Sequence, residues 1–214
     1  MPTGTDPGTT LQALVALLAI ANPLAAVPVF LSLVPAGNSA AARQAASRVA
    51  IAVFLILTGA VFIGRMVLEM FGISFAAFRV GGGLVVTLTG LDMLRSGHGA
   101  EPNEAVAASA AEHLIVPVAM PLIAGPGTII AAMTMAARAA DAGRPSVMLV
   151  AVAVVAVFVW LVLALSSWVQ QRIGARGQAI VARFMGLVLV AIGAQLVLSG
   201  IADFFGLRGA IAAP

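Results

Sequence analysis

Two prolines interrupt long apolar stretches of this chain, and they stand 103 residues apart, at Pro23 and Pro126. Proline cannot donate a backbone hydrogen bond, and its ring clashes with the preceding turn of a helix. When the sequence is shifted by this offset without gaps, other positions coincide: Ile20-Ala21 with Ile123-Ala124, Gly83-Leu84-Val85 with Gly186-Leu187-Val188, and Gly90 with Gly193. The pattern predicts one unit written twice, with a helix interruption near the start of each copy.

The composition places these interruptions in a membrane. Hydrophobic residues make up 62% of the chain and charged residues 9%, against roughly 25% charged residues in a soluble domain. Apolar runs of about 20 residues are typical of transmembrane helices. In a bilayer, unpaired backbone groups are costly unless protein or water pairs with them, so a broken helix must satisfy them in some other way. We therefore expect an all-α integral membrane protein.

Six transmembrane helices are predicted as two three-helix repeats of inverted topology. They cover about residues 11–34, 48–70, 75–94, 114–137, 147–169 and 179–202. The first repeat is 1–95, a polar linker is 96–112, and the second repeat is 113–214. Since three is an odd number of crossings, the second repeat enters from the opposite face, and a pseudo-two-fold axis in the membrane plane relates the copies. The first and fourth helices are expected to be discontinuous.

Paired interruptions in two inverted halves are typical of a transporter site near the bilayer midplane. After each proline a half-helix begins, whose first N–H groups lack intrahelical acceptors and whose end carries a positive dipole charge. Such ends suit a carboxylate, while freed carbonyls and the Asn22 amide suit an ammonium group. The predicted substrate-binding residues are Asn22, Pro23, Leu24, Ala25, Ala26, Gly125, Pro126, Gly127 and Thr128. The alternative is two ordinary proline kinks, which membrane helices tolerate.

Asp92 and its equivalent in the second repeat, Gln195, are candidates for coupling to H+ or Na+. A carboxylate inside a membrane helix can carry a proton or coordinate a cation. The alternative for Asp92 is a contact with Arg95 at the helix end. The chain has no cysteine and two histidines, so no metal centre and no other cofactor is expected. The net charge of +3 comes from scattered arginines that form no basic stripe, so no nucleic-acid partner is expected.

Other charged residues are interpreted as surface features of the bilayer. Arg65 and Glu69 are four residues apart and can pair on one helix face or extend to the headgroups. Arg79 and Arg183 are interpreted as interfacial anchors. Arg43, Arg48, Arg95, Arg172, Arg176 and Arg183 fall on one side, and Arg65, Arg79, Arg138, Arg144 and Arg208 on the other. The positive-inside rule favours the larger group as cytoplasmic, which puts both termini outside.

Two stretches carry a family resemblance. The sequence from Ala21 to Leu31, with Asn-Pro-Leu-Ala-Ala-Val-Pro, and that from Pro121 to Ile129, with Gly-Pro-Gly-Thr, resemble the MarC family of bacterial inner-membrane proteins. That family includes the SnatA-type small neutral amino acid transporters, and the resemblance covers essentially the whole chain. One departure is Ala25, where the family often has glycine, and this narrows access to the backbone. The resemblance implies a multi-pass protein of the bacterial inner (cytoplasmic) membrane that transports zwitterions such as glycine, alanine or serine.

We therefore expect a secondary transporter that works by alternating access. A channel-like conduit for small solutes is an alternative, with the interruptions acting as a filter of backbone dipoles. A non-transporting membrane partner that assembles through glycine-rich helices is another. An enzyme is not expected, because no serine–histidine pair, metal-ligand set or carboxylate pair falls at membrane depth. The sequence leaves the exact substrate and the oligomeric state open.

Overall fold

The computed structural model describes residues 7–34, 39–96, 123–141 and 145–207, and no strand occurs among them. The helices are α1 (Pro7–Ala21), α2 (Pro23–Leu33), α3 (Ser39–Met70), α4 (Phe75–Ser96), α7 (Pro126–Asp141), α8 (Pro145–Ala164) and α9 (Ser166–Phe204). Five described stretches are long and apolar enough to cross a membrane: Leu14–Leu31, Ser39–Met70, Phe75–Arg95, Val147–Ala164 and Arg176–Phe204. The predicted all-helical class is confirmed for the described residues, and the five stretches are consistent with the predicted membrane protein.

Some predicted boundaries differ from the observed ones. Residues 97–122, which include most of the predicted linker and the beginning of the fourth span, lie outside the described residues. The described part of the fourth span contains a shorter apolar helix, Pro126–Ala137. The predicted end of the fifth span, at residue 169, is wrong because α8 ends at Ala164. The following residues belong to α9, which is kinked at Gly174 with φ 63° and ψ 172°. A positive φ of this kind is readily adopted only by glycine.

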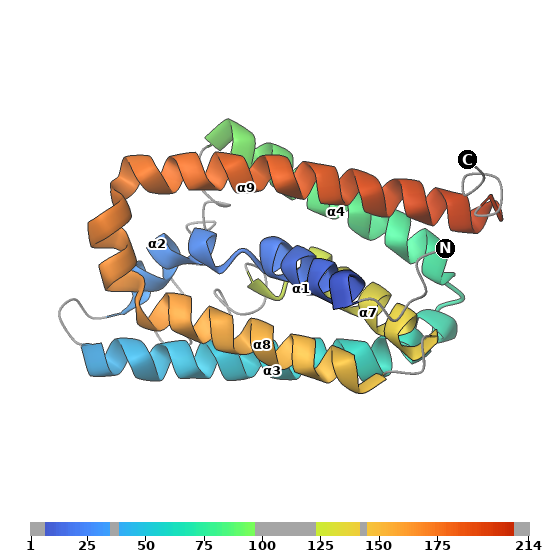
Figure 1. Ribbon diagram of the computed structural model, residues 1–214, viewed down its shortest axis with the longest axis horizontal. Helices are drawn as coiled ribbons and strands as arrows, with labels where there is room; N and C mark the ends of the chain where they lie inside the picture. The colour runs from blue at the N-terminus through green and yellow to red at the C-terminus, as the bar shows by residue number, and fades with distance from the viewer. Residues whose placement is uncertain (1–6, 35–38, 97–122, 142–144, 208–214) are drawn as a thin grey trace.

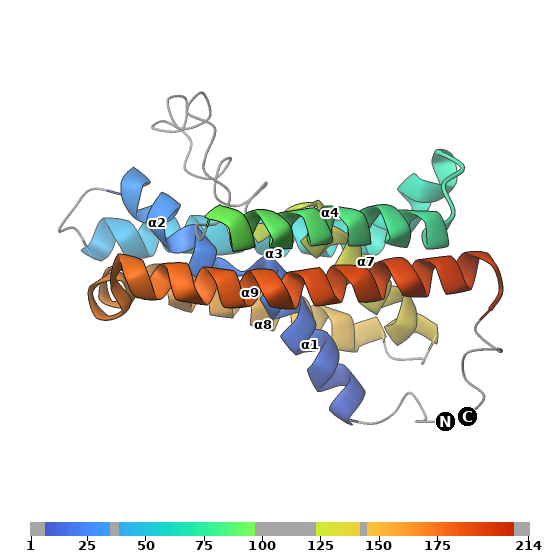
Figure 2. The same cartoon turned by 90° about the horizontal axis from the view of Figure 1, so that it is seen from above.

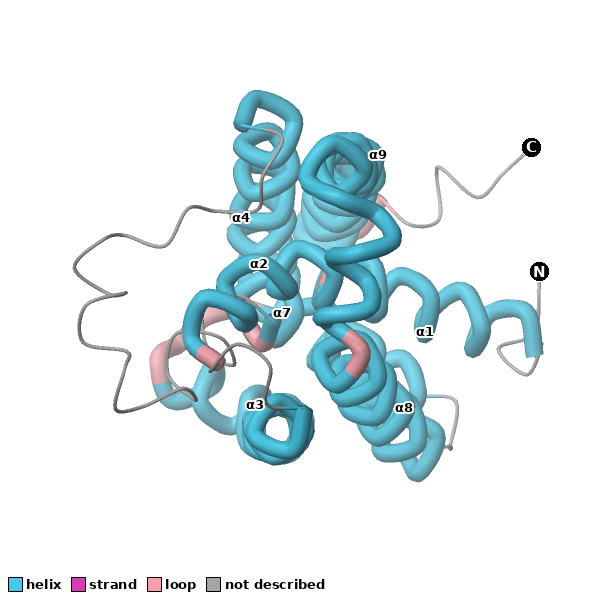
Figure 3. Tube along the Cα trace, turned by 90° about the vertical axis from the view of Figure 1, so that its left-hand side faces the viewer, coloured by secondary structure: helices cyan, strands magenta, loops and turns pink. Residues whose placement is uncertain are grey.

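The helices form three layers. In Figure 1 and in the end view of Figure 3, α4 and α9 lie side by side in one outer layer, and α3 and α8 in the other. The interrupted segment α1–α2 and the helix α7 lie between these two layers and contact both of them. Figure 2 shows α1 inclined away from the long axis that the four outer helices share. The interruptions are thus held in the interior of the bundle.

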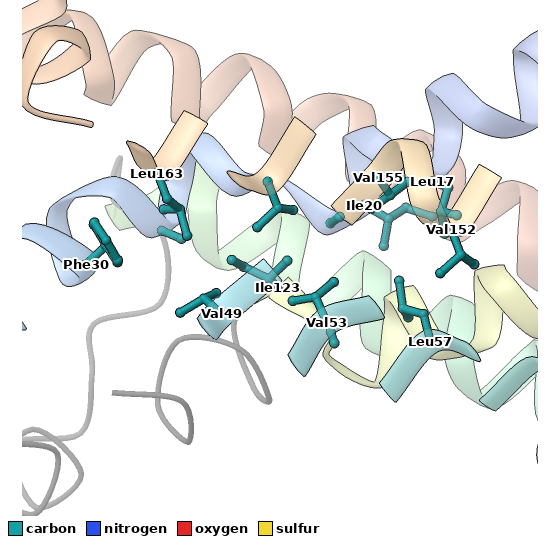
Figure 4. Close-up of a cluster of buried hydrophobic side chains, with 14 of the residues drawn as sticks. Leu17, Ile20, Phe30, Val49, Val53, Leu57, Ile123, Val152, Val155 and Leu163 are labelled. Atoms are coloured by element: carbon teal, nitrogen blue, oxygen red, sulfur yellow. The ribbon is translucent and has the colours of Figure 1, made fainter. Parts of the chain in front are cut away.

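A continuous apolar core fills the space between the middle layer and the α3–α8 layer (Figure 4). Its labelled members are Leu17, Ile20, Phe30, Val49, Val53, Leu57, Ile123, Val152, Val155 and Leu163. Lipid tails are as apolar as these side chains, so in a bilayer the core is stabilised by close packing rather than by exclusion of water. Trp160 of α8 adds a polar contact, since its indole N–H donates to Ser47 Oγ of α3 at 3.0 Å.

Candidate functional site

The first interruption is a single residue in a left-handed conformation. Helix α1 ends at Ala21, Asn22 has φ 38° and ψ 59°, and α2 starts at Pro23. Asn22 is the one non-glycine residue with positive φ among the described residues, and asparagine tolerates this region better than other side chains do. Proline suits the first helical position because its missing N–H has no intrahelical acceptor there. The Asn22 backbone N–H still donates to the Leu18 carbonyl at 3.0 Å, so the chain turns directly after a complete helical turn.

The second interruption precedes α7. Ile123 and Ala124 are buried, Gly125 lies outside regular helix, and α7 starts at Pro126. The Thr128 hydroxyl donates to the Ile123 carbonyl at 2.7 Å, and Thr128 is 2% exposed. This bond pairs a carbonyl of the segment before the interruption, which a continuous helix would have paired with a backbone N–H.

The structure brings the two interruptions together in the interior. A Cβ atom added at Gly127 would lie 2.6 Å from Val86 Cγ2 of α4 and 3.6 Å from Ile20 Cγ2 of α1. Ile20 is two residues before Asn22, so the start of α7 packs against the end of α1. Figure 1 shows α2 and α7 running from the middle of the bundle toward opposite ends. The first turns of both half-helices, with their positive dipole ends, therefore face the interior.

The remaining predicted site residues fall into two groups. At the first interruption, Pro23 and Ala26 are buried, and Leu24 and Ala25 are half-buried. At the second, Gly125 is buried and Pro126, the first residue of α7, is exposed. Asp92 on α4 and Gln195 on α9 are both exposed. The role of Asp92 and Gln195 in ion coupling stays a prediction.

Two residues of α4 that lie at the interruptions, Val86 and Met93, were not predicted from the sequence. Met93 of α4 is 2% exposed, and its Sδ accepts a hydrogen bond from Asn22 Nδ2 at 3.5 Å. A methionine on an apolar membrane helix carries no sequence signal that separates it from lipid-facing neighbours. Only the packing of α4 against the end of α1 identifies it.

The interpretation of Arg79 as an interfacial anchor is wrong. Arg79 is 4% exposed, its guanidinium forms an ion pair with Asp203 of α9, and it lies 5.2 Å from the centre of the Phe75 ring. Asp203 was also missed, although an acidic residue in the last turn of an apolar span is itself a signal. Arg65 does pair with Glu69, at 3.0 Å on the exposed face of α3. The buried pair joins α4 to the end of α9.

Comparisons with known proteins give consistent matches over nearly the whole chain. The family model described as "MarC family integral membrane protein" matches residues 9–205. A UPF0056 membrane protein of Methanocaldococcus jannaschii is 35% identical over 188 residues, which cover 86% of this chain and 92% of the relative. The UPF0056 inner membrane protein MarC of Salmonella typhimurium is 33% identical over 207 residues, which cover 89% and 92%. The UPF0056 membrane protein YhcE of Escherichia coli is 29% identical over 195 residues, which cover 89% and 91%. No solved structure matches significantly.

Proposed function

The chain belongs to the MarC family of integral membrane proteins, and from that premise we propose that it is a secondary transporter of small neutral amino acids, of the glycine, alanine and serine class. Its substrate binds near the bilayer midplane between the first turns of α2 and α7, and transport proceeds by alternating access. The protein is a multi-pass component of the bacterial inner membrane, where the relative from Salmonella is named as an inner membrane protein.

The observation that carries this proposal is the contact between the two interruptions at Gly127, Ile20 and Val86. By helix geometry, the N–H groups of Leu24, Gly127 and Thr128 have no acceptor within their own half-helices. Donors that meet in a low-dielectric interior, with two positive dipole ends behind them, favour a carboxylate. The absence of a side chain at Gly127 lets Val86 pack against the start of α7, and this tight packing limits the ligand to a small side chain.

The contact between α4 and α9 supports an inverted-repeat architecture with repeats 1–95 and 113–214. In the sequence, Gly83 is equivalent to Gly186 and Gly90 to Gly193. An added Cβ at Gly83 would lie 2.7 Å from the Gly193 carbonyl oxygen, and one at Gly90 would lie 2.6 Å from that of Gly186. Gly83 therefore contacts Gly193, the equivalent of Gly90, and Gly90 contacts Gly186, the equivalent of Gly83. A two-fold axis produces this reciprocal pattern. Two such halves can open toward either side of the membrane with similar contacts, which is the basis of alternating access.

Counterflow in proteoliposomes tests the proposal. Vesicles loaded with unlabelled glycine should take up labelled glycine transiently above equilibrium, because a carrier exchanges substrate across the membrane. In Gly127→Ala the new Cβ meets Val86 at 2.6 Å, so we expect exchange to fall at least tenfold. The double variant Gly127→Ala/Val86→Ala removes the obstructing methyl groups and should recover part of the exchange.

The matched control is Gly81→Ala, since no atom lies within 4 Å of an added Cβ at Gly81. This variant should exchange glycine as the unmodified protein does. Equilibration of label without transient accumulation would indicate the channel-like conduit instead. An unmodified protein that shows no saturable flux of any small amino acid would overturn the proposal and leave the assembly hypothesis.

A further inference from the structure

The Asn22 side chain is a strong hydrogen-bond donor that is held against a weak acceptor. Asn22 is 8% exposed and makes no side-chain cap bond to the first turn of α2. Its Nδ2 instead donates to the thioether sulfur of Met93 at 3.5 Å. Buried amides usually pair with oxygen, and a thioether is among the weakest acceptors in proteins. An oxygen atom of a ligand can therefore readily replace the Met93 sulfur as the acceptor of this hydrogen bond.

This donor lies where the proposed carboxylate would bind. The side chain belongs to the residue immediately before α2, so its Nδ2 lies near the N–H of Leu24, which has no acceptor within the helix. Pro23 has no N–H, and the Ala25 N–H already donates to the Asn22 carbonyl at 3.1 Å. A carboxylate can accept from Nδ2 and from the Leu24 N–H at once. A carboxylate oxygen that accepts from Nδ2 would exchange a weak sulfur bond for a charge-assisted one.

The arrangement exists in one repeat only. The equivalent of Asn22 in the second repeat is Gly125, and the equivalent of Met93 is Leu196. The second interruption thus has neither the amide donor nor the thioether. The two halves of the site therefore differ in chemistry, and this difference can orient a zwitterion that a symmetric site would bind in either direction.

We propose that the Met93 sulfur accepts the hydrogen bond from Asn22 Nδ2 until substrate binds. The substrate carboxylate then displaces the sulfur and becomes the acceptor of this bond. This inference rests on the proposed function and names the recognition element of the same site. Met93 is a positioning residue that sets the apparent affinity. Asn22 contacts the substrate through its donor Nδ2 and selects the carboxylate, whereas the sequence alone suggested that its amide binds the ammonium group. Ligands that keep the ammonium group but lack the carboxylate should therefore bind poorly.

Substitutions taken from the second repeat provide the test. Met93→Leu keeps the volume and removes the sulfur acceptor, so the substrate no longer competes with it. The glycine concentration that gives half-maximal counterflow should fall about threefold, since a weak hydrogen bond contributes at the low end of the usual range. Asn22→Gly suits the left-handed conformation without strain, and it should raise the half-maximal concentration at least tenfold. In the unmodified protein, glycinamide should compete with labelled glycine much less well than unlabelled glycine does, and Asn22→Gly should reduce this discrimination.

The double variant Asn22→Gly/Met93→Leu separates recognition from packing. Without the amide, the Met93 substitution has no bond to release, so the double variant should match Asn22→Gly alone. If Met93→Leu changes the half-maximal concentration equally in both backgrounds, Met93 acts by packing only and the inference is wrong. The inference is also wrong if Asn22→Gly leaves the affinity unchanged while glycine exchange persists. Absence of exchange in the unmodified protein would overturn both the inference and the proposed function.

Discussion

At the scale of single residues, a buried ion pair and an exposed ion pair differ in how much they contribute to stability. Arg79 and Asp203 pair inside the helix bundle, whereas Arg65 and Glu69 pair on its surface with side chains 78% and 66% exposed. Removing one partner of a buried pair leaves an uncompensated charge, which is strongly destabilising, while an exposed pair contributes little. The repeat equivalents of Arg79 and Asp203 are Ala182 and Ala100, so the buried pair occurs at one end of the α4–α9 contact only.

We expect Asp203→Asn to lower the free energy of unfolding by about 3 kcal/mol, because Arg79 loses its counter-charge in the interior. Glu69→Gln is the matched control, and it should change stability by less than about 1 kcal/mol. Thermal and denaturant unfolding of the purified protein in detergent would measure both. Equal effects from the two variants would contradict the view that burial decides the contribution of these pairs.

Asp92 is the residue that tests ion coupling. Its side chain is exposed on α4, whereas that of the next residue, Met93, is buried against Asn22. We therefore expect Asp92→Asn to leave the dependence of glycine exchange on pH and on Na+ unchanged. Uptake measured under imposed proton and sodium gradients would show this. Loss of either dependence would instead assign the coupling role to Asp92.

At the scale of helices, the contact between α4 and α9 depends on glycines spaced seven residues apart. Gly83 and Gly90 on α4, and Gly186 and Gly193 on α9, bring the two backbones within van der Waals distance. Gly200 continues the row, since its added Cβ would lie 2.9 Å from the Ala76 carbonyl oxygen. Small residues at an interface allow this approach in a bilayer, where packing rather than water drives association.

Gly83→Ala and Gly81→Ala form a pair that isolates this packing effect. The Cβ added at Gly83 meets the Gly193 backbone, so the helices must separate, and we expect a loss of about 1–3 kcal/mol. At Gly81 the added Cβ meets no atom, and alanine is the better helix former by about 1 kcal/mol. The unfolding midpoint should fall for the first variant and stay or rise for the second. A rise in both would mean that the helix contact is looser than described.

At the scale of the whole molecule, the interrupted helices form the middle layer of a three-layer bundle (Figure 3). Each outer layer is a pair of long helices, α4 with α9 and α3 with α8. In the alternating access proposed above, a site between these layers opens to either side if the middle layer moves against the outer pairs. Such a movement requires no loss of the α4–α9 contact, in which glycines of the two helices lie close to each other.

Cysteine accessibility tests this movement, because the chain contains no cysteine that would add background labelling. In oriented vesicles, we expect the thiol of Thr128→Cys to react with a membrane-impermeant reagent added from either side, and saturating glycine to slow both reactions. The control Val159→Cys replaces a fully buried residue of the α3–α8 core and should react from neither side. Labelling of Thr128→Cys from one side only would contradict alternating access.

Sequence alone was enough to identify the membrane class and the family resemblance. It also identified the two interruptions and the residues that form the broken helix ends, because proline and glycine act locally on the backbone of a long apolar helix. It could not show which face of each helix is buried. Val86 is 2% exposed and Leu88, two residues later, is 65% exposed, although both are aliphatic. In water the apolar face of a helix is the buried one, but in a bilayer the lipid-facing side is apolar too. The Asn22–Met93 bond, the Arg79–Asp203 pair and the outward position of Asp92 therefore followed only from the packing of helices that are distant in the chain.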